Sequence, residues 1–252
     1  MTTIAVEDTS DQLAAKAFAF TSALWFALAT SFGMIAAGYL IAPDLMANIE
    51  FIHFGRSRPI HINLVLFGFV TPGMIAAAFY FTPRLLRTEL YSQKLGVIAA
   101  ILWNITLVAI VISLGLGYSQ GREYAEPPWI VDMMVAGIFI LVIFNLLKTV
   151  STRKEPILYV SIWYASAALV LTAVGYCLGN VIWKPNSGAL LGIPDAILLW
   201  FYGHNIFGLL LTPMGLAVAY YVLPLATRSP LYSHTLSLIG FWSLIVVYTH
   251  IG

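Results

Sequence analysis

The sequence predicts an all-α fold: a polytopic transmembrane helical bundle with about seven spanning helices. Hydrophobic residues make up 60% of the 252 residues and charged residues only 9%. The mean hydropathy is +0.90, and soluble domains of this length are normally far less apolar. The apolar residues also gather into stretches of about 20, the length with which a helix crosses a bilayer.

The spanning helices are predicted in order along one domain. Residues 1–13 form a polar tail, and residues 14–252 form the membrane domain, in which we identify no internal repeat and no long linker. The first apolar stretch is too long for a signal peptide and lacks a cleavage-like end. The predicted spans are 14–42, 59–83, 95–117, 128–148, 156–181, 193–224 and 231–252.

The distribution of basic residues predicts how the chain crosses the membrane. With the N-terminus on the cytoplasmic side, eight basic residues lie inside and four lie outside, in agreement with the positive-inside rule. We therefore expect a cytoplasmic N-terminus. The inner residues are Lys16, Arg84, Arg87, Lys94, Lys148, Arg153, Lys154 and Arg228, and the outer residues are Arg56, Arg58, Arg122 and Lys184.

Two histidines lie within these apolar stretches. His204 lies in a segment without charge between Asp195 and Arg228, and His61 lies near the start of the second span. Ionisable groups inside a membrane usually face a cavity, a partner or a metal, and imidazole suits both haem iron and copper. The alternatives are an interfacial His61 bonded to a carbonyl group and a His204 that packs between helices.

A shared depth links the histidines to Tyr248. His61 lies near the outer end of its span, and His204 follows Ile193 by 11 residues, which is about 16 Å of helix. Tyr248 lies near the outer end of the last span. One buried cofactor site would require such a common depth.

Hydroxyl groups run inward from this level. Thr212 and Tyr220 lie along the sixth span, and Ser237 lies low on the seventh, on the same helix face as Tyr248. Such a track could relay protons from the inner side, although ordinary hydrogen bonding between helices is the alternative.

The predicted outer loops carry charges of both signs. Arg56 and Arg58 precede His61, and arginines near a haem ligand could pair with haem propionates; interfacial anchoring is the alternative. Glu123 and Glu126 could hold a hard cation such as calcium, or could simply cap the fourth span in solvent. A net charge of +1 argues against a nucleic-acid partner, and the single cysteine, Cys177, excludes a disulfide framework.

Several strings resemble the catalytic subunit of cbb3-type cytochrome c oxidases. The most specific are Trp200-Phe-Tyr-Gly-His-Asn-Ile-Phe-Gly and Phe54-Gly-Arg-Ser-Arg-Pro-Ile-His-Ile-Asn. Gly121-Arg-Glu-Tyr-Ala-Glu and Ser233-His-Thr-Leu-Ser-Leu-Ile-Gly-Phe-Trp are also similar, and the likeness runs in order from about residue 15. The Tyr-Gly-His-Asn and Gly-Arg-x-Arg-Pro-x-His strings are specific together, whereas either alone would be weak.

The resemblance implies a role for each candidate residue. It implies His61 as an axial ligand of a low-spin haem b, His204 as a ligand of the copper ion CuB beside a high-spin haem b, and Tyr248 as the tyrosine linked to that copper ligand. It also implies Thr212, Tyr220 and Ser237 as positions of the proton-uptake path, and Glu123 as part of a calcium site.

The same resemblance implies a terminal respiratory oxidase of the bacterial inner membrane that reduces O2 to water and translocates protons. Its partners would be c-type cytochrome subunits and membrane lipid. The family continues through about twelve helices, so we expect this sequence to be the N-terminal portion of such a subunit and to be inactive alone. The rival readings are a related nitric oxide reductase and a non-catalytic haem-binding or transport protein.

Overall fold

The computed structural model describes residues 12–44, 46, 48–120, 122–181 and 192–250, and every regular element in this part of the chain is helical. Most of the predicted polar tail, and Lys184, lie outside the described residues. The α-helices are α1 (Leu13–Ile41), α2 (Phe54–Asn63), α3 (Thr71–Leu86), α4 (Gln93–Gly115), α5 (Trp129–Ser151), α6 (Val160–Tyr176), α7 (Ile193–Asn205), α8 (Thr212–Thr227) and α9 (His234–Val247).

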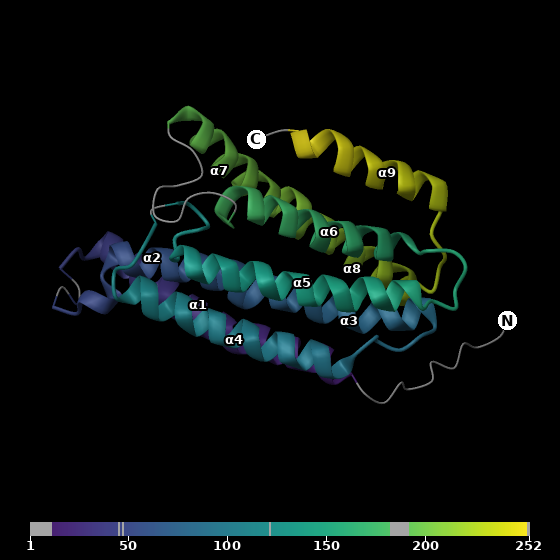
Figure 1. Cartoon of the computed structure of the whole chain (residues 1–252), viewed down its shortest axis with the longest axis horizontal. Coiled ribbons are helices and arrows are strands. Elements are labelled where there is room, and N and C mark those ends of the chain that lie inside the picture. The colour runs from purple at the N-terminus through teal and green to yellow at the C-terminus, as the bar shows by residue number, and fades with distance from the viewer. Residues whose placement is uncertain (1–11, 45, 47, 121, 182–191, 251–252) are drawn as a thin grey trace.

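The helices lie side by side in a bundle (Figure 1). Six helical stretches are long and apolar enough to cross a membrane, and two of these are composite: α2 continues into α3, and α7 continues into α8. The seventh predicted span corresponds to α9 and the short 3₁₀ turn Tyr248–His250, which is a shorter helical stretch within the described residues.

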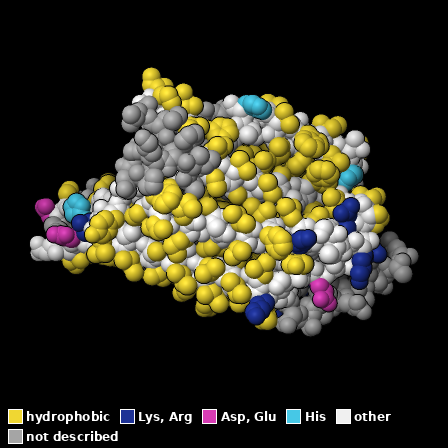
Figure 2. Space-filling view, in the orientation of Figure 1, with side chains coloured by type: hydrophobic (Ala, Val, Ile, Leu, Met, Phe, Trp, Pro, Cys, Tyr) yellow, Lys and Arg dark blue, Asp and Glu magenta, His cyan; other side chains and the backbone are white. Residues whose placement is uncertain are grey.

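The surface agrees with a membrane location. Large apolar side chains such as those of Phe20, Met34 and Ile140 are exposed along the flanks of the bundle. Figure 2 shows Lys and Arg side chains gathered at one end of the molecule, with hydrophobic side chains over the flank between the ends. An apolar flank of this kind is suited to contact with lipid rather than water. Together with the six spanning stretches, it indicates a multi-pass membrane protein.

The two composite helices change winding just before a proline. The π-helical segments Leu64–Val70 and Ile206–Leu211 precede Pro72 and Pro213, which cannot donate a backbone hydrogen bond. Side chains satisfy carbonyl groups in the first segment: Trp103 Nε1 donates to Phe67 O at 2.7 Å, and Ser22 Oγ donates to Phe69 O at 2.7 Å.

These composite helices are the centre of an internal repeat, so our prediction that no repeat exists was wrong. Thr71-Pro72 matches Thr212-Pro213 at a constant offset, and the match continues through the next helix. Arg87 and Arg228 both end their helices with φ of 52°. The Ser92 and Ser233 hydroxyls both cap the following helix, accepting from Leu95 N and Leu236 N. The α2–α3–α4 and α7–α8–α9 units therefore repeat one design.

Candidate functional site

His204 and Tyr248 form the central pair of the candidate site. Their rings stack with centroids 4.5 Å apart and planes 29° apart. Gly208, one turn after His204, makes this possible because an added Cβ there would overlap the Tyr248 ring. The Nε2 atom of His204 is buried and has no hydrogen-bond partner in the described structure. A buried nitrogen of this kind is suited to bind a metal ion.

His61 is held against α1. Its Nδ1 atom lies 2.8 Å from Ala29 O, and because a carbonyl oxygen only accepts, Nδ1 carries the proton. The Nε2 atom then keeps its lone pair, which is the state required of an iron ligand. Gly33 lets the ring approach: an added Cβ at Gly33 would lie 2.7 Å from the His61 ring. The predicted alternative, a histidine bonded to a carbonyl group, accounts for the hydrogen bond of Nδ1 but not for Nε2.

The described residues do not form a complete metal site by themselves. Nowhere in the described part of the chain do three His, Cys, Asp or Glu side chains gather closely enough to hold a metal ion. The chain offers one imidazole at each candidate position, so the donor set fits a haem ligand and one copper ligand. Any copper ion here would need further ligands.

The two arginines predicted near the cofactors each pair with an acid, and for Arg58 that acid is the predicted Glu123. Arg56 Nη1 donates to Gly115 O at 2.9 Å, and its Nη2 lies 3.5 Å from Glu50. Arg58 Nη2 lies 2.9 Å from Glu123 Oε1, and both side chains are partly exposed. Glu123, the predicted calcium ligand, is therefore engaged by an arginine.

The predicted proton-path residues are separate in the described structure. Thr212 is exposed at the start of α8. The ring of Tyr220 stacks on Tyr164, with centroids 5.7 Å apart. Ser237 is buried and donates to Ser233 O at 2.9 Å within its own helix. No hydrogen bond among the described residues links the three.

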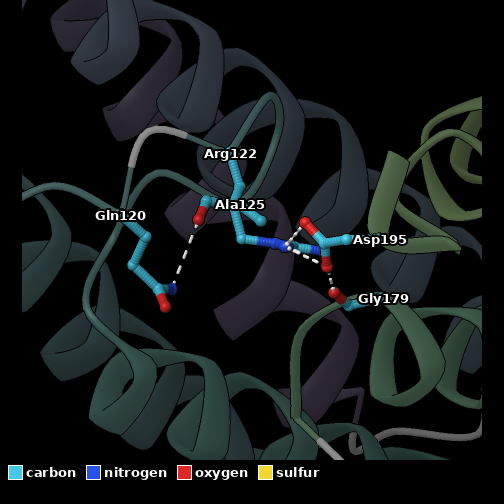
Figure 3. Close-up of polar contacts among 5 residues, drawn as sticks. All are labelled: Gln120, Arg122, Ala125, Gly179 and Asp195. Carbon is cyan, nitrogen blue, oxygen red and sulfur yellow. Dashed lines mark hydrogen bonds and ion pairs between the residues drawn. The ribbon is translucent and has the colours of Figure 1, made fainter. Parts of the chain in front are cut away.

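An ion pair between a buried arginine and a half-buried aspartate joins two segments that are distant in the sequence. Arg122 Nη1 lies 2.8 Å from both carboxylate oxygens of Asp195, and Arg122 Nη2 donates to Gly179 O at 2.8 Å (Figure 3). Arg122 is only 7% exposed. The only available signal was that both residues are charged and lie beside predicted spans in a chain with few charges.

Two further buried acids line the same region. Glu126 accepts from Asn63 Nδ2 at 2.7 Å, and Asp132 is fully buried, accepting from Tyr176 and from Gln120 at 2.7 Å each. Glu126 lies outside the spanning helices, and burial raises the pKa of its carboxyl group, partly offset by the Asn63 hydrogen bond. Sequence reasoning treated Glu126 as a solvated or calcium-binding acid and passed over Asp132.

Fold and site together define a class of protein: a multi-pass helical membrane protein in which a histidine with a buried Nε2 atom that lacks a hydrogen-bond partner stacks on a tyrosine, and a second histidine is held against α1 by a hydrogen bond through Nδ1. The chain belongs to the cytochrome c and quinol oxidase polypeptide I family, whose family model matches residues 13–252.

Three relatives illustrate the similarity. The chain is 35% identical over 237 residues to a cytochrome c oxidase subunit 1 homolog of Agrobacterium tumefaciens (strain T37), covering 90% of this chain and 43% of the relative. It is 31% identical to the cbb3-type cytochrome c oxidase subunit CcoN1 of Stutzerimonas stutzeri (94% and 51%) and 34% identical to cytochrome c oxidase subunit 1 of Rhodobacter capsulatus (94% and 46%). The chain thus spans about half the length of these relatives.

Proposed function

We propose that this chain forms part of the catalytic subunit of a cbb3-type cytochrome c oxidase, which reduces O2 to water at a haem–copper centre and translocates protons. The observation that supports this most is the pairing of His204, whose Nε2 atom is buried without a partner, with the Tyr248 ring. An imidazole alone would suit several metal sites. A phenol stacked on that imidazole favours O2 chemistry over the nitric oxide reductase alternative, because cleavage of the O–O bond needs an electron as well as a proton and a phenol can supply both.

Each residue then has a proposed task. His61 would bind the iron of a low-spin haem b through Nε2, and His204 would bind CuB beside a high-spin haem b. When bound, the haems and copper supply the redox chemistry that O2 reduction needs. Gly208 leaves the space in which the Tyr248 phenol lies against His204, ready to give up a proton.

The remaining assignments concern the periphery of the site. Arg56 and Arg58 would pair with haem propionates, and Glu123 would contribute to a calcium site. Thr212, Tyr220 and Ser237 would belong to a hydrated proton-uptake path, in which water bridges hydroxyl groups that do not touch. The partners would be c-type cytochrome subunits, in a bacterial inner membrane with the N-terminus of this chain in the cytoplasm.

The experiment compares histidine variants in the full-length gene product. His204→Ala should remove the copper and O2 turnover while most of the low-spin haem spectrum persists. His61→Ala should abolish the low-spin haem b spectrum. His234→Ala, at an exposed position on α9, is the control and should retain both. Copper at the control level in His204→Ala, or an unchanged haem spectrum in His61→Ala, would refute the corresponding role.

A further inference from the structure

The connection between α4 and α5 is bonded to both helices that carry the candidate ligands. Four residues of this connection make the contacts, and we call them the tie segment: Arg122, Glu123, Tyr124 and Glu126. Two of them contact α7, which carries His204, and the other two contact α2, which carries His61. The contacts alternate between the two helices along the segment.

The contacts with α7 lie near its two ends. Arg122 binds both carboxylate oxygens of Asp195 at 2.8 Å, in the first turn of α7. Tyr202, two residues before His204, donates its hydroxyl to Tyr124 O at 2.9 Å. Because α7 is a continuous helix from Asp195 to Asn205, fixing these two points fixes where His204 lies.

The contacts with α2 lie on either side of His61, whereas both contacts with α7 precede His204. Arg58, three residues before His61, pairs with Glu123 at 2.9 Å. Asn63, two residues after His61, donates to Glu126 Oε2 at 2.7 Å, and both of these side chains are buried. A shift of α2 along its axis would break one contact or the other.

The backbone of the tie segment is itself constrained. Tyr124 has φ of 61°, a left-handed conformation that bulky residues rarely adopt. Such a conformation persists only where the surrounding contacts determine it. Arg122 Nη1 contacts both carboxylate oxygens of Asp195 while its Nη2 donates to Gly179 O, so the guanidinium is held in one orientation as well as at one distance.

We propose that the tie segment is a clamp that sets the position of His204 relative to His61. Its members are positioning residues, which act on the two imidazoles through Asp195, Tyr202, Arg58 and Asn63. That this spacing serves to place a copper ligand beside a haem rests on the proposed function. The clamp itself does not depend on the proposed function. A site assembled from two separate helices needs such support around its ligands.

Pulsed electron paramagnetic resonance on the full chain tests the clamp. Nitroxide labels on Gly55→Cys in α2 and Ile197→Cys in α7, in a Cys177→Ala background, report the distance between the two helices. Ile197 is 58% exposed, and an added Cβ at Gly55 meets nothing within 4 Å. Asp195→Asn should widen this distance distribution or shift its mean.

Two further variants make the result decisive. If Asp195→Asn fails to fold because Arg122 is left unpaired, the double variant Arg122→Met with Asp195→Leu removes both charges and should widen the distribution instead. Glu155→Gln is the matched control, because it breaks the Arg87–Glu155 ion pair at the opposite end of the bundle (Figure 1). The control should leave the distribution unchanged.

A second pair of labels separates positioning from general loosening. Labels on Phe20→Cys in α1 and Ile140→Cys in α5, both exposed, should give the same distances with and without the clamp. An unchanged α2–α7 distribution in the folded clamp variants, or equal widening at both label pairs, would overturn the proposal. Normal copper in His204→Ala would refute the proposed function and leave the clamp standing.

Discussion

Two glycines determine how closely the candidate ligands are packed. Gly33 receives the His61 ring, and Gly208 receives the Tyr248 ring, at separations that leave no room for a methyl group. Both positions are helical, where alanine would otherwise be the more favourable residue. Glycine at each position therefore makes room for the neighbouring ring and does not stabilise the helix itself.

Replacing Gly208 tests this interpretation. We expect Gly208→Ala to destabilise the protein by roughly 1–3 kcal/mol, because the new methyl group overlaps the Tyr248 ring and the ring must move. Gly215→Ala, on the same composite helix, meets nothing within 4 Å and should be neutral or stabilising by up to about 1 kcal/mol. Thermal unfolding in detergent measures both variants. Equal shifts in the two would contradict a packing role for Gly208.

The buried carboxyl group of Glu126 predicts a pH dependence of stability. Burial raises its pKa in the folded protein, so the folded state binds more protons than the unfolded state between the ordinary and the raised values. The contribution of Glu126 to the free energy of unfolding should therefore fall as pH rises through that window. Glu126→Gln should flatten the dependence, whereas Glu89→Gln, at an exposed position, should preserve it. Unfolding midpoints measured from about pH 4 to about pH 8, a range that spans ordinary and raised carboxyl pKa values, compare the pH dependence of the two variants.

At the scale of the element, the π-helical segment Leu64–Val70 depends on a partner from another helix. Trp103 is 2% exposed and donates to Phe67 O. Trp103→Phe would keep an aromatic ring but remove the donor, leaving a buried carbonyl group without that hydrogen bond. We expect a loss of about 1–3 kcal/mol in the free energy of unfolding.

A second tryptophan provides the control for this change. Trp242 on α9 is 51% exposed, so Trp242→Phe should change the free energy of unfolding by about 0.5 kcal/mol or less. Denaturation followed by circular dichroism compares the two variants. Similar losses would mean that ring volume, and not the hydrogen bond to Phe67 O, determines the effect of Trp103.

The same scale explains what the sequence could predict. Six spanning stretches could be located because lipid demands uninterrupted apolar residues. The π-helical segments could not, because they depend on side chains such as Trp103 that are 36 residues away. The internal repeat is visible in the sequence at Thr71-Pro72 and Ser92, which match Thr212-Pro213 and Ser233, whereas the apolar stretches between them resemble any other spanning helix.

The candidate site was predictable only in part. His61, His204 and Tyr248 stood out because polar groups are costly in a membrane. Their supports did not, since Arg122 and Asp195 are 73 residues apart and each reads as an ordinary loop charge. The proton path was predicted from helix spacing and from the resemblance, and neither gives the neighbours of a residue in this chain. The ring of Tyr220, for example, stacks on Tyr164.

At the scale of the whole molecule, the two ends of the bundle differ in chemistry. One end carries the tie segment and its buried ion pair, where positive charge is matched by acids. The other carries the basic residues at the ends of α3 and α5, including Lys148, Arg153 and Lys154. Figure 2 shows Lys and Arg side chains gathered at one end of the molecule. Basic residues outnumber acids at that end, where Arg87 pairs with Glu155, and an excess of positive charge favours the cytoplasmic side of a membrane.

This asymmetry predicts the topology. In a Cys177→Ala background, a cysteine at Glu50, before α2, should react with a membrane-impermeant maleimide in intact spheroplasts. A cysteine at Lys154, at the basic end and also exposed, should react only after the membrane is permeabilised. Helices α2 and α5 begin at the same end of the bundle (Figure 1). Glu50 comes before the start of α2 and Lys154 comes after the end of α5, so the two positions lie on opposite sides of the membrane in either orientation. If the cysteine at Lys154 reacted in intact spheroplasts and the one at Glu50 did not, the predicted orientation would be wrong. The tie segment, with both histidines near it, would then lie on the cytoplasmic side.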